Sequence, residues 1–445
     1  MSLRRIPGYR AIWFDLGQRT EYGSKYSGPL ATYTSNHTPL AIHAPQVQRT
    51  FFVYGGTPAA DQRHLLCMAG YYDHRTGEVP QPVVVHDKQG VDDPHDNPVI
   101  NIGPDGRIWV FVAGRGRTRP GFVYRSVEPY SIDRFELLRE AEICYPQPWF
   151  SDDGHCLLLL TKYTGLRELY WAVSADGVAW SEDRKLAGMQ GHYQVSDANG
   201  GRVFTAFNRH PDQSPDKRTD LYVTFTDDLG QTWRNVQGEV LGTPLVDPHC
   251  PALVRDYAAE GLLVYLHDIN FDAAGHPLVL YTTSRDWRPG PSGDPRTWTV
   301  AHWLGDRWAF HEITTSTHNY DCGCIHVEAD GTWRVIGPTE PGPQHWGSGG
   351  EVAMWLSRDD GASWRKVRQL TSGSAYNHDY VRRPVNAHAD FYGFWCDGDP
   401  DAFSPCRLYF TDQAGARVYR LPAEISGETA LPELVSAHAA DDRRR

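Results

Sequence analysis

The sequence predicts an all-β fold of the β-propeller type, because one turn motif recurs between strand-like runs. Each copy has a Ser or Thr, an acidic turn, a Gly and then a Trp, and the strict copies are Ser174–Trp180, Thr226–Trp233 and Ser357–Trp364. An Asp side chain caps its own turn, Gly supplies a positive φ angle, and Trp fixes the hairpin to the layer beneath. Such repetition is typical of propellers, whose functional residues lie on loops at the ends of the central axis.

Looser copies of the motif extend the repeat. They are Gly103–Trp109, Ser151–Gly154, Glu328–Trp333 and Thr411–Gly415. A four-stranded blade takes about 40–50 residues, so the chain holds at most about eight blades, and about six or seven once termini and insertions are allowed for. The alternative is a β-sandwich that contains several unrelated hairpins.

The chain shows no internal domain boundary. No Pro/Gly/Ser-rich or charged linker divides it, and the Pro/Gly stretch Arg288–Pro295 is expected to be an insertion loop. We therefore expect one propeller domain over residues 1–435 and a disordered C-terminal tail over residues 436–445.

Composition excludes some partners. The net charge of −12 argues against nucleic acid, and no segment approaches the length of apolar sequence that spans a membrane. Fifteen Trp suit packing between blades and are also compatible with stacking on sugar rings. The N-terminus Met1–Gly8 lacks the apolar core of a signal peptide, so we expect either a cytoplasmic protein or a secreted one whose signal has been removed. We expect a monomer.

One cluster resembles a metal site. His318, Cys322, Cys324 and His326 lie within nine residues, but the paired C-x₂-C spacing of zinc sites is absent. The other Cys residues suit buried thiols. We therefore expect no bound metal and no cofactor.

Polar side chains gather in several loop-like segments. These are Tyr33–Leu40, Val91–Pro98, Gly114–Gly121, Lys162–Tyr170, Asn208–Pro211, Asp247–Cys250 and Gly342–Glu351. In the third, Arg115, Arg117 and Arg119 on a Gly-rich turn indicate either an anion clamp or a solvated turn. The chain contains no nucleophile elbow, P-loop or dinucleotide fingerprint.

Six segments together resemble one family. They are His37–Ile42, Phe51–Gly56, His95–Pro98, Lys162–Trp171, Gly337–Gln344 and Arg383–His388. From about Tyr9 to Pro422 the chain resembles the BNR-repeat propellers of glycoside hydrolase family 145, which are α-L-rhamnosidases, and the related ulvan and rhamnose–glucuronate lyases. The resemblance implies a seven-bladed β-propeller that acts on glycans in which L-rhamnose is linked α-1,4 to D-glucuronate.

The resemblance implies two chemistries on opposite faces of the propeller. The hydrolases depend on a single His in an Asn-His-x-Pro-Leu segment, which is His37 here, acting as acid or base near neutral pH. The lyases use the His of a His-Asp-Asn-Pro segment, which is His95 here. With a second His, an Arg and tyrosines, they abstract the C5 proton of a uronate, neutralise its carboxylate and eliminate the 4-linked sugar.

Positional matching to the lyases shows departures. The second His position falls on Arg115, the Arg position falls on Arg167, and the tyrosines fall near Phe150 and Arg209. Neither Phe nor Arg can replace a phenol as a proton donor at neutral pH. These departures favour the hydrolase over the lyase.

We therefore expect an exo-acting α-L-rhamnosidase, with His37 and His95 as catalytic residues. The expected substrate-binding residues are Arg115, Tyr163, Arg167, His210, Trp346 and Glu351. The alternatives are a lyase that cleaves the same or an ulvan-type linkage, a non-catalytic propeller that binds the same glycans, and a sialidase. The last rests on the capped turns, which are scaffold features and do not specify a function.

Overall fold

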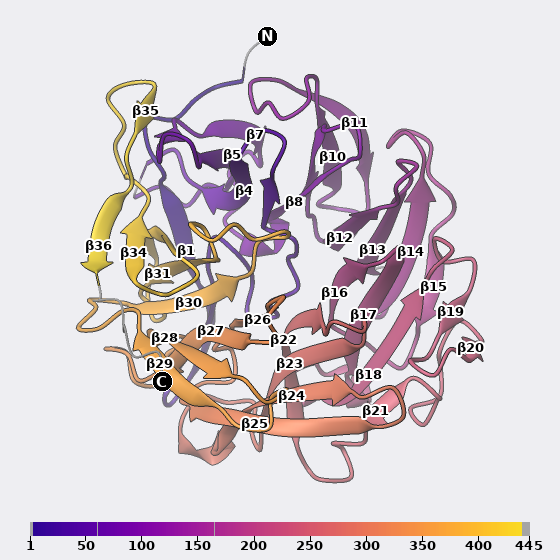
Figure 1. The fold of residues 1–445 in the computed structure, drawn as a ribbon. Helices are drawn as coiled ribbons and strands as arrows, with labels where there is room; N and C mark the ends of the chain where they lie inside the picture. Colours follow the sequence, from indigo (N-terminus) through magenta and orange to yellow (C-terminus); the bar gives the residue numbers. More distant parts are fainter. Residues whose placement is uncertain (1–2, 60, 164, 438–445) are drawn as a thin grey trace.

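The structure is a computed structural model that describes residues 3–59, 61–163 and 165–437. Seven antiparallel sheets are arranged radially around one axis, and the chain runs round the ring in sequence order (Figure 1). The predicted seven-bladed β-propeller is confirmed. The sandwich alternative is wrong, because consecutive hairpins form separate radial sheets.

Each blade is a meander that starts at its innermost strand. Blades 1 to 3 contain β3 (Ala41–Ala44), β4 (Arg49–Gly56), β5 (Leu66–Asp73) and β7 (Val83–Asp87); β8 (Pro98–Ile102), β9 (Ile108–Val112), β10 (Gly121–Ser126) and β11 (Phe135–Ala141); and β12 (Cys144–Phe150), β13 (Cys156–Lys162), β14 (Glu168–Ser174) and β15 (Arg184–Ala187). Blades 4 and 5 contain β16 (Gln194–Asn199), β17 (Arg202–Arg209), β18 (Thr219–Thr226), β19 (Trp233–Arg234), β20 (Val240–Leu241) and β21 (Leu253–Arg255); and β22 (Leu263–Phe271), β23 (Pro277–Ser284), β24 (Arg296–Trp303) and β25 (Trp308–Ser316). Blades 6 and 7 contain β26 (Cys324–Val327), β27 (Trp333–Glu340), β28 (Glu351–Ser357) and β29 (Arg365–Gln369); and β30 (Asn377–Arg382), β31 (Gly393–Gly398), β33 (Leu408–Thr411), β34 (Arg417–Arg420) and β36 (Glu433–Ala437).

The helical segments are single 3₁₀ turns in the connections between strands. They are η1 (Pro94–Asp96), η2 (Pro211–Gln213), η3 (Pro215–Lys217) and η4 (Pro291–Gly293), the last within the predicted insertion loop. None of the helices in the described residues is long and apolar enough to cross a lipid bilayer.

The predicted capped turns form as expected. In the second copy, Asp228 Oδ1 accepts two hydrogen bonds, one from Thr226 Oγ1 over 2.9 Å and one from Thr232 N over 2.8 Å. Gly230 has a φ of +79°, and a Cβ there would lie 2.3 Å from Trp171 Nε1 in the preceding blade. The glycine therefore serves both the turn conformation and the contact between blades 3 and 4.

The ring closes where blade 7 meets blade 1. β1 (Ala11–Thr20), which continues into β2 (Gly23–Ser27), pairs with β32 (Ser404–Cys406), and β6 (Val79–Pro80) pairs with β35 (Thr429–Ala430). Nearer the axis, β3 also meets blade 7 through a parallel bridge from Ile42 to Val385. The ends of the chain are thus joined by main-chain hydrogen bonds at three points.

The predicted disordered tail starts too early in the sequence. Ser436 and Ala437 belong to β36, where they pair with Val418 and Arg417 of β34. The boundary at residue 436 is therefore wrong, because those two residues complete the outer edge of blade 7. Residues 438–445 lie outside the described residues.

Candidate active site

The candidate active site lies on the face opposite the capped turns. Successive connections of an antiparallel meander alternate between the two ends of the sheet. The connection between β13 and β14 therefore leaves blade 3 on one face and the capped turn after β14 on the other. The face reached by the β13–β14 connection is shared by two kinds of loop. One kind joins the second and third strands of a blade, and the other enters the innermost strand of a blade. These loops carry the residues described next. Loops held by a rigid ring are suited to precise placement of such side chains.

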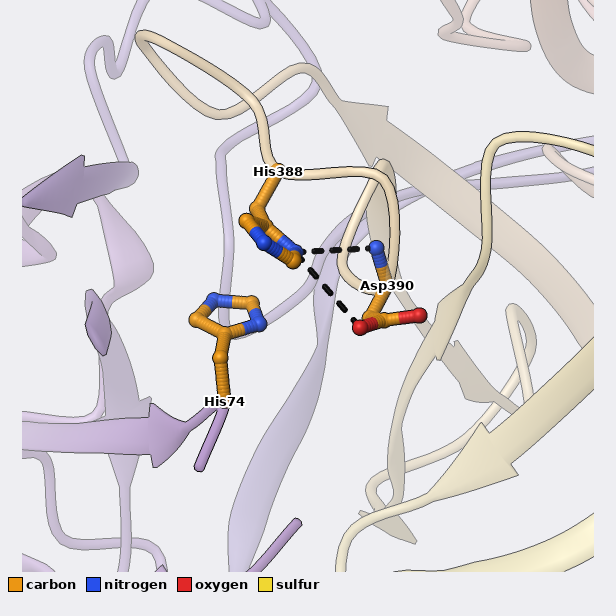
Figure 2. Close-up of side chains that lie close together, drawn as sticks. All are labelled: His74, His388 and Asp390. Carbon is orange, nitrogen blue, oxygen red and sulfur yellow. Dashed lines mark hydrogen bonds and ion pairs between the residues drawn. The ribbon is translucent and has the colours of Figure 1, made fainter. Parts of the chain in front are cut away.

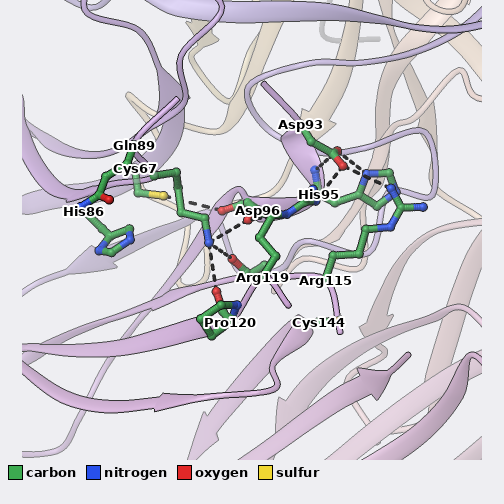
Figure 3. Close-up of polar contacts among 12 residues, drawn as sticks. Cys67, His86, Gln89, Asp93, His95, Asp96, Arg115, Arg119, Pro120 and Cys144 are labelled. Carbon is green, nitrogen blue, oxygen red and sulfur yellow. Dashed lines mark hydrogen bonds and ion pairs between the residues drawn. The ribbon is translucent and has the colours of Figure 1, made fainter. Parts of the chain in front are cut away.

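His95 is the centre of the site and is oriented by Asp93. Asp93 is the N-cap of η1, where its Oδ1 accepts from the backbone N–H of His95 over 3.0 Å. The same oxygen lies 2.5 Å from His95 Nδ1 (Figure 3). His95 is buried, and its Nε2 has no hydrogen-bond partner among the described residues. Burial lowers the pKa of His95 and outweighs the opposite effect of Asp93, so the neutral ring presents Nε2 as an acceptor.

Two arginines of the Gly-rich turn hold Asp93 in place. Arg119 Nη2 lies 2.7 Å and Arg115 Nη1 3.2 Å from Asp93 Oδ2. Although burial favours the neutral carboxyl, the hydrogen bond from His95 and the charge of Arg119 keep the pKa of Asp93 well below its usual range. In the predicted anion clamp, Arg115 and Arg119 therefore bind a carboxylate of the protein itself, that of Asp93. Arg117 is exposed on the outside of the turn.

A buried cluster of charged side chains, Asp96, Lys88 and Arg119, supports the position of Asp93. The Asp96 carboxylate is fully buried and accepts from Arg119 Nε over 2.8 Å. It also lies 2.7 Å from Lys88 Nζ, which donates to the carbonyls of Ala113 and Pro120. Figure 3 shows these contacts as one chain of polar contacts that ends at His95. Since each charge has several partners, the cluster restricts the position of Asp93.

Phenol groups line the site beside His95. The Tyr145 ring lies 5.9 Å from that of His95, and the Tyr163 hydroxyl donates to the Tyr145 hydroxyl over 3.1 Å. Tyr145 has a φ of +48°, which is uncommon for a bulky residue and coincides with an irregularity in the β12–β13 register. Tyr193 packs edge-on against Tyr145 at 5.9 Å. Burial raises the pKa of Tyr145 and Tyr163 well above the usual value, so both phenols keep their protons at neutral pH.

Two further arginines approach these rings, and neither has a carboxylate partner within the part of the chain that the structure describes. The Arg167 guanidinium lies 4.9 Å from the Tyr163 ring, and its Nε is buried without a hydrogen-bond partner in the described part of the chain. Arg218 is buried between Tyr193 at 4.7 Å and Tyr265 at 4.8 Å, and its Nη2 is likewise unpaired among the described residues. A buried guanidinium with unused donors is suited to binding an anionic group.

His37 occupies the same side of the propeller as His95. Its Nε2 lies 3.2 Å from the His95 carbonyl oxygen, and its ring lies 5.4 Å from Tyr145. The expectation that the two histidines lie on opposite faces is wrong, because β3 and β8 are neighbouring innermost strands and their entering loops meet. Burial lowers the pKa of His37 to about 3, which leaves it neutral in a supporting position.

The structure brings only some of the predicted substrate-binding residues together. Arg115 and Arg167 both lie against the Tyr163 ring, at 5.7 and 4.9 Å, and Tyr163 joins the His95 group through Tyr145. His210 joins through its ring contact of 4.5 Å with Tyr193. Glu351 instead accepts from the backbone and hydroxyl of Ser374 at 2.8 Å each. Trp346 contacts Tyr22, at the tip of the β1–β2 hairpin.

The phenols come from positions other than those expected. Phe150 lies at the far end of β12 from Tyr145 and packs on Trp109, and Arg209 is paired with Asp220. Tyr145, Tyr193 and Arg218 were missed in the sequence. Their shared signal is that each stands within one residue of the start of a strand that begins on the site face.

The sequence-derived metal candidate does not converge. Cys324 Sγ lies 3.8 Å from His326 Nε2, whereas His318 Nδ1 accepts from the backbone of Tyr320. Over the described ranges, three ligand atoms converge instead at His74, His388 and Asp390.

Comparisons with known proteins agree with this architecture. Residues 61–316 match the family described as BNR repeat-containing family member. A solved ulvan lyase of polysaccharide lyase family PL25, bound to -[GlcA(1-4)Rha3S]-, superposes with a TM-score of 0.72 at 15% identity, over 92% of this chain and 96% of that one. The polysaccharide lyase Uly1 superposes with a TM-score of 0.62 at 13% identity, over 93% and 100%. No curated protein matches in sequence. At these identities the structural likeness establishes the fold.

Proposed function

The chain belongs to the family of BNR repeat-containing proteins, and we propose that it is a polysaccharide lyase that cleaves a glycan next to a uronate by β-elimination. The observation that carries the proposal is the grouping around His95 of protonated phenols, cationic side chains and an imidazole nitrogen that no described residue hydrogen-bonds. Elimination requires a base, a proton donor and a cation beside the carboxylate, and the cluster supplies all three.

Each residue has a distinct role in the proposed reaction. The guanidinium of Arg167, with Arg115 near the same Tyr163 ring, neutralises the uronate carboxylate, which makes the C5 proton more acidic. His95 Nε2 takes that proton, and the electron pair of the C5–H bond forms the C4–C5 double bond. The C4–O bond breaks, and Tyr145, connected to Tyr163, protonates the departing oxygen. The products are a 4,5-unsaturated uronate and a sugar with a new hydroxyl group.

The same geometry gives less support to the hydrolysis expected from the sequence. Glycosidases ordinarily use two carboxyl groups, one as acid and one as base or nucleophile. At His95 the nearest carboxylate, Asp93, is already bound by His95, Arg115 and Arg119. His37 is buried and its pKa is lowered to about 3, so it is not the imidazolium acid that hydrolysis would need at neutral pH.

The substrate class follows from the cations and the resemblance. Half-buried Arg167 and buried Arg218 offer two separate guanidinium groups, which suits a glycan with more than one anionic substituent. The similar ulvan lyase is described with a glucuronate–sulfated rhamnose ligand. We therefore propose rhamnose- and uronate-containing polysaccharides as substrates.

The test follows two products in one reaction. The chain is incubated with rhamnose–glucuronate oligosaccharides and with ulvan, while ultraviolet absorbance of the unsaturated uronate and free rhamnose are recorded. The proposal predicts absorbance that rises with cleavage and is lost in His95→Ala but kept in His155→Ala, a partly exposed histidine on the opposite face. Cleavage without absorbance would establish hydrolysis, and His37→Ala would then be the variant to measure. Binding without cleavage would establish a glycan-binding propeller.

A further inference from the structure

A cluster of histidines lies where blade 7 closes against blade 1. His43 is on β3 and His74 follows β5, both in blade 1, whereas His388 and Asp390 lie in the loop between β30 and β31 of blade 7. The His74 and His388 rings face one another at 3.8 Å between centroids, with 41° between their planes (Figure 2). The His43 ring lies 4.9 Å from that of His388. The cluster is remote in sequence from the loops that carry His95.

Ligand atoms of three of these residues converge. One atom each from His74, His388 and Asp390 lie within 4.8 Å of one another, and all three residues are half-buried. The Thr50 hydroxyl occupies His74 Nε2 over 2.8 Å, while His74 Nδ1 is buried without a hydrogen-bond partner among the described residues. A hydrogen bond at one ring nitrogen orients the other, which is the usual arrangement of a metal-binding imidazole.

His43 adds a further nitrogen beside this group. Its ring hydrogen-bonds to the backbone of Asn386, and its Nε2 is buried and unpaired in the part of the chain that the structure describes. Two buried imidazole nitrogens without partners in one cluster are costly unless something binds them. Asp390 completes the set, with one carboxylate oxygen 3.5 Å from the exposed Arg417 and the other 3.7 Å from His388 Nδ1.

The ligand types suit a transition-metal cation. His388 Nδ1 accepts from the backbone N–H of Asp390 over 3.1 Å, which leaves its Nε2 as the nitrogen for an ion. Imidazole nitrogens with a carboxylate oxygen favour Zn²⁺ and related transition metals over Ca²⁺ or Mg²⁺, which prefer oxygen ligands alone.

We propose that His74, His388 and Asp390, with His43 beside them, bind one Zn²⁺ or similar divalent transition-metal ion that clamps blade 1 to blade 7. The ion would join His74 in blade 1 to His388 and Asp390 in blade 7, and blades 2 to 6 lie between these positions along the chain. An ion that binds only the native ring stabilises it by mass action, so the clamp adds to the main-chain pairing at the seam.

The test measures binding and stability of the untagged chain after treatment with a chelator. Calorimetric titration with ZnSO₄ is expected to show one tight site per chain, and the melting temperature rises by about 3 °C at a hundredfold excess over Kd. MgCl₂ leaves the melting temperature unchanged. His74→Ala and His388→Ala lose the tight site, whereas His249→Ala, at an exposed histidine outside the cluster, keeps it.

A spectroscopic measurement covers the case in which a variant fails to fold. Co²⁺ replaces Zn²⁺ in the wild-type chain, and its visible absorption reports the geometry of nitrogen and oxygen ligands. Asp390→Asn, which keeps the side-chain shape, is expected to weaken binding and alter that spectrum. Absence of tight Zn²⁺ binding by the wild-type chain, or equal binding by folded His388→Ala, would overturn the proposal and leave a stack of neutral histidines.

Discussion

Asp93 accepts a hydrogen bond from Nδ1 of His95 across 2.5 Å, and this contact decides which nitrogen of the ring can react. Because Asp93 also caps η1 at the backbone N–H of His95, one carboxylate sets both the position of the residue and the tautomer of its ring. The opposite nitrogen, Nε2, is left without a partner among the described residues, in a ring that lies 5.9 Å from that of Tyr145.

Replacing Asp93 by Asn tests this orienting role. The amide keeps the shape but cannot hold a strong negative charge against His95 and Arg119, so the ring loses its fixed tautomer. We expect kcat to fall roughly 10–100-fold with a smaller change in KM. Steady-state kinetics by ultraviolet absorbance measures both constants. A variant that loses only substrate affinity would show that Asp93 binds substrate and does not orient His95.

The pH dependence of the wild-type enzyme follows from the state of His95. The base must be unprotonated, so kcat/KM falls as pH drops through the pKa of His95. Burial lowers that pKa from 6.5, and the acidic limb is therefore expected to have its midpoint below pH 6.5. Since Asp93 raises the pKa of His95, Asp93→Asn shifts the limb further toward acid. A midpoint above pH 6.5 would contradict His95 as the base.

Tyr145→Phe removes the proposed proton donor. Loss of a general acid ordinarily costs about 10²–10⁴-fold in rate, and the fall is expected in kcat because the phenol acts on the departing oxygen. Tyr124→Phe is the matched control, since that hydroxyl, on β10 of blade 2, bonds to His86 on β7 of blade 1. Equal activity of both variants would move the acid role to Tyr163, which Tyr163→Phe then tests.

Arg167→Gln tests neutralisation of the uronate carboxylate. The guanidinium lies against Tyr163, and its Nε has no hydrogen-bond partner in the described ranges, so the substrate supplies the missing anion. We expect kcat/KM to fall about 10²–10³-fold. With a substrate whose uronate is reduced to the neutral sugar, wild type and variant should be equally inactive. Residual cleavage of that neutral substrate by the wild type would argue against elimination.

The fold was predictable because its signal is local. Asp, Gly and Trp within each capped turn determine a hairpin from neighbouring residues alone, and Gly230 shows that the turn also serves blade packing. His95 and Arg167 were predicted as site residues from motifs that lie within single loops. Convergence of different blades was not predictable in this way. Matching by position placed a phenol at Phe150, on the same strand as Tyr145 but at the end that faces away from the site.

The inter-blade role of Gly230 gives a prediction about stability that is independent of the proposed function. An added methyl group at Gly230 is strained by the φ of +79° and would lie 2.3 Å from Trp171 Nε1, so the packing of Trp171 between blades 3 and 4 must shift. Gly331 is the matched control, because its φ of +83° imposes a similar strain while nothing lies within 4 Å of its Cβ position. We expect Gly230→Ala to lower the free energy of unfolding by about 2–4 kcal/mol and Gly331→Ala by about 1 kcal/mol. Urea unfolding followed by Trp fluorescence measures both. Equal losses would show that backbone strain alone acts at Gly230 and that Trp171 yields to the added methyl.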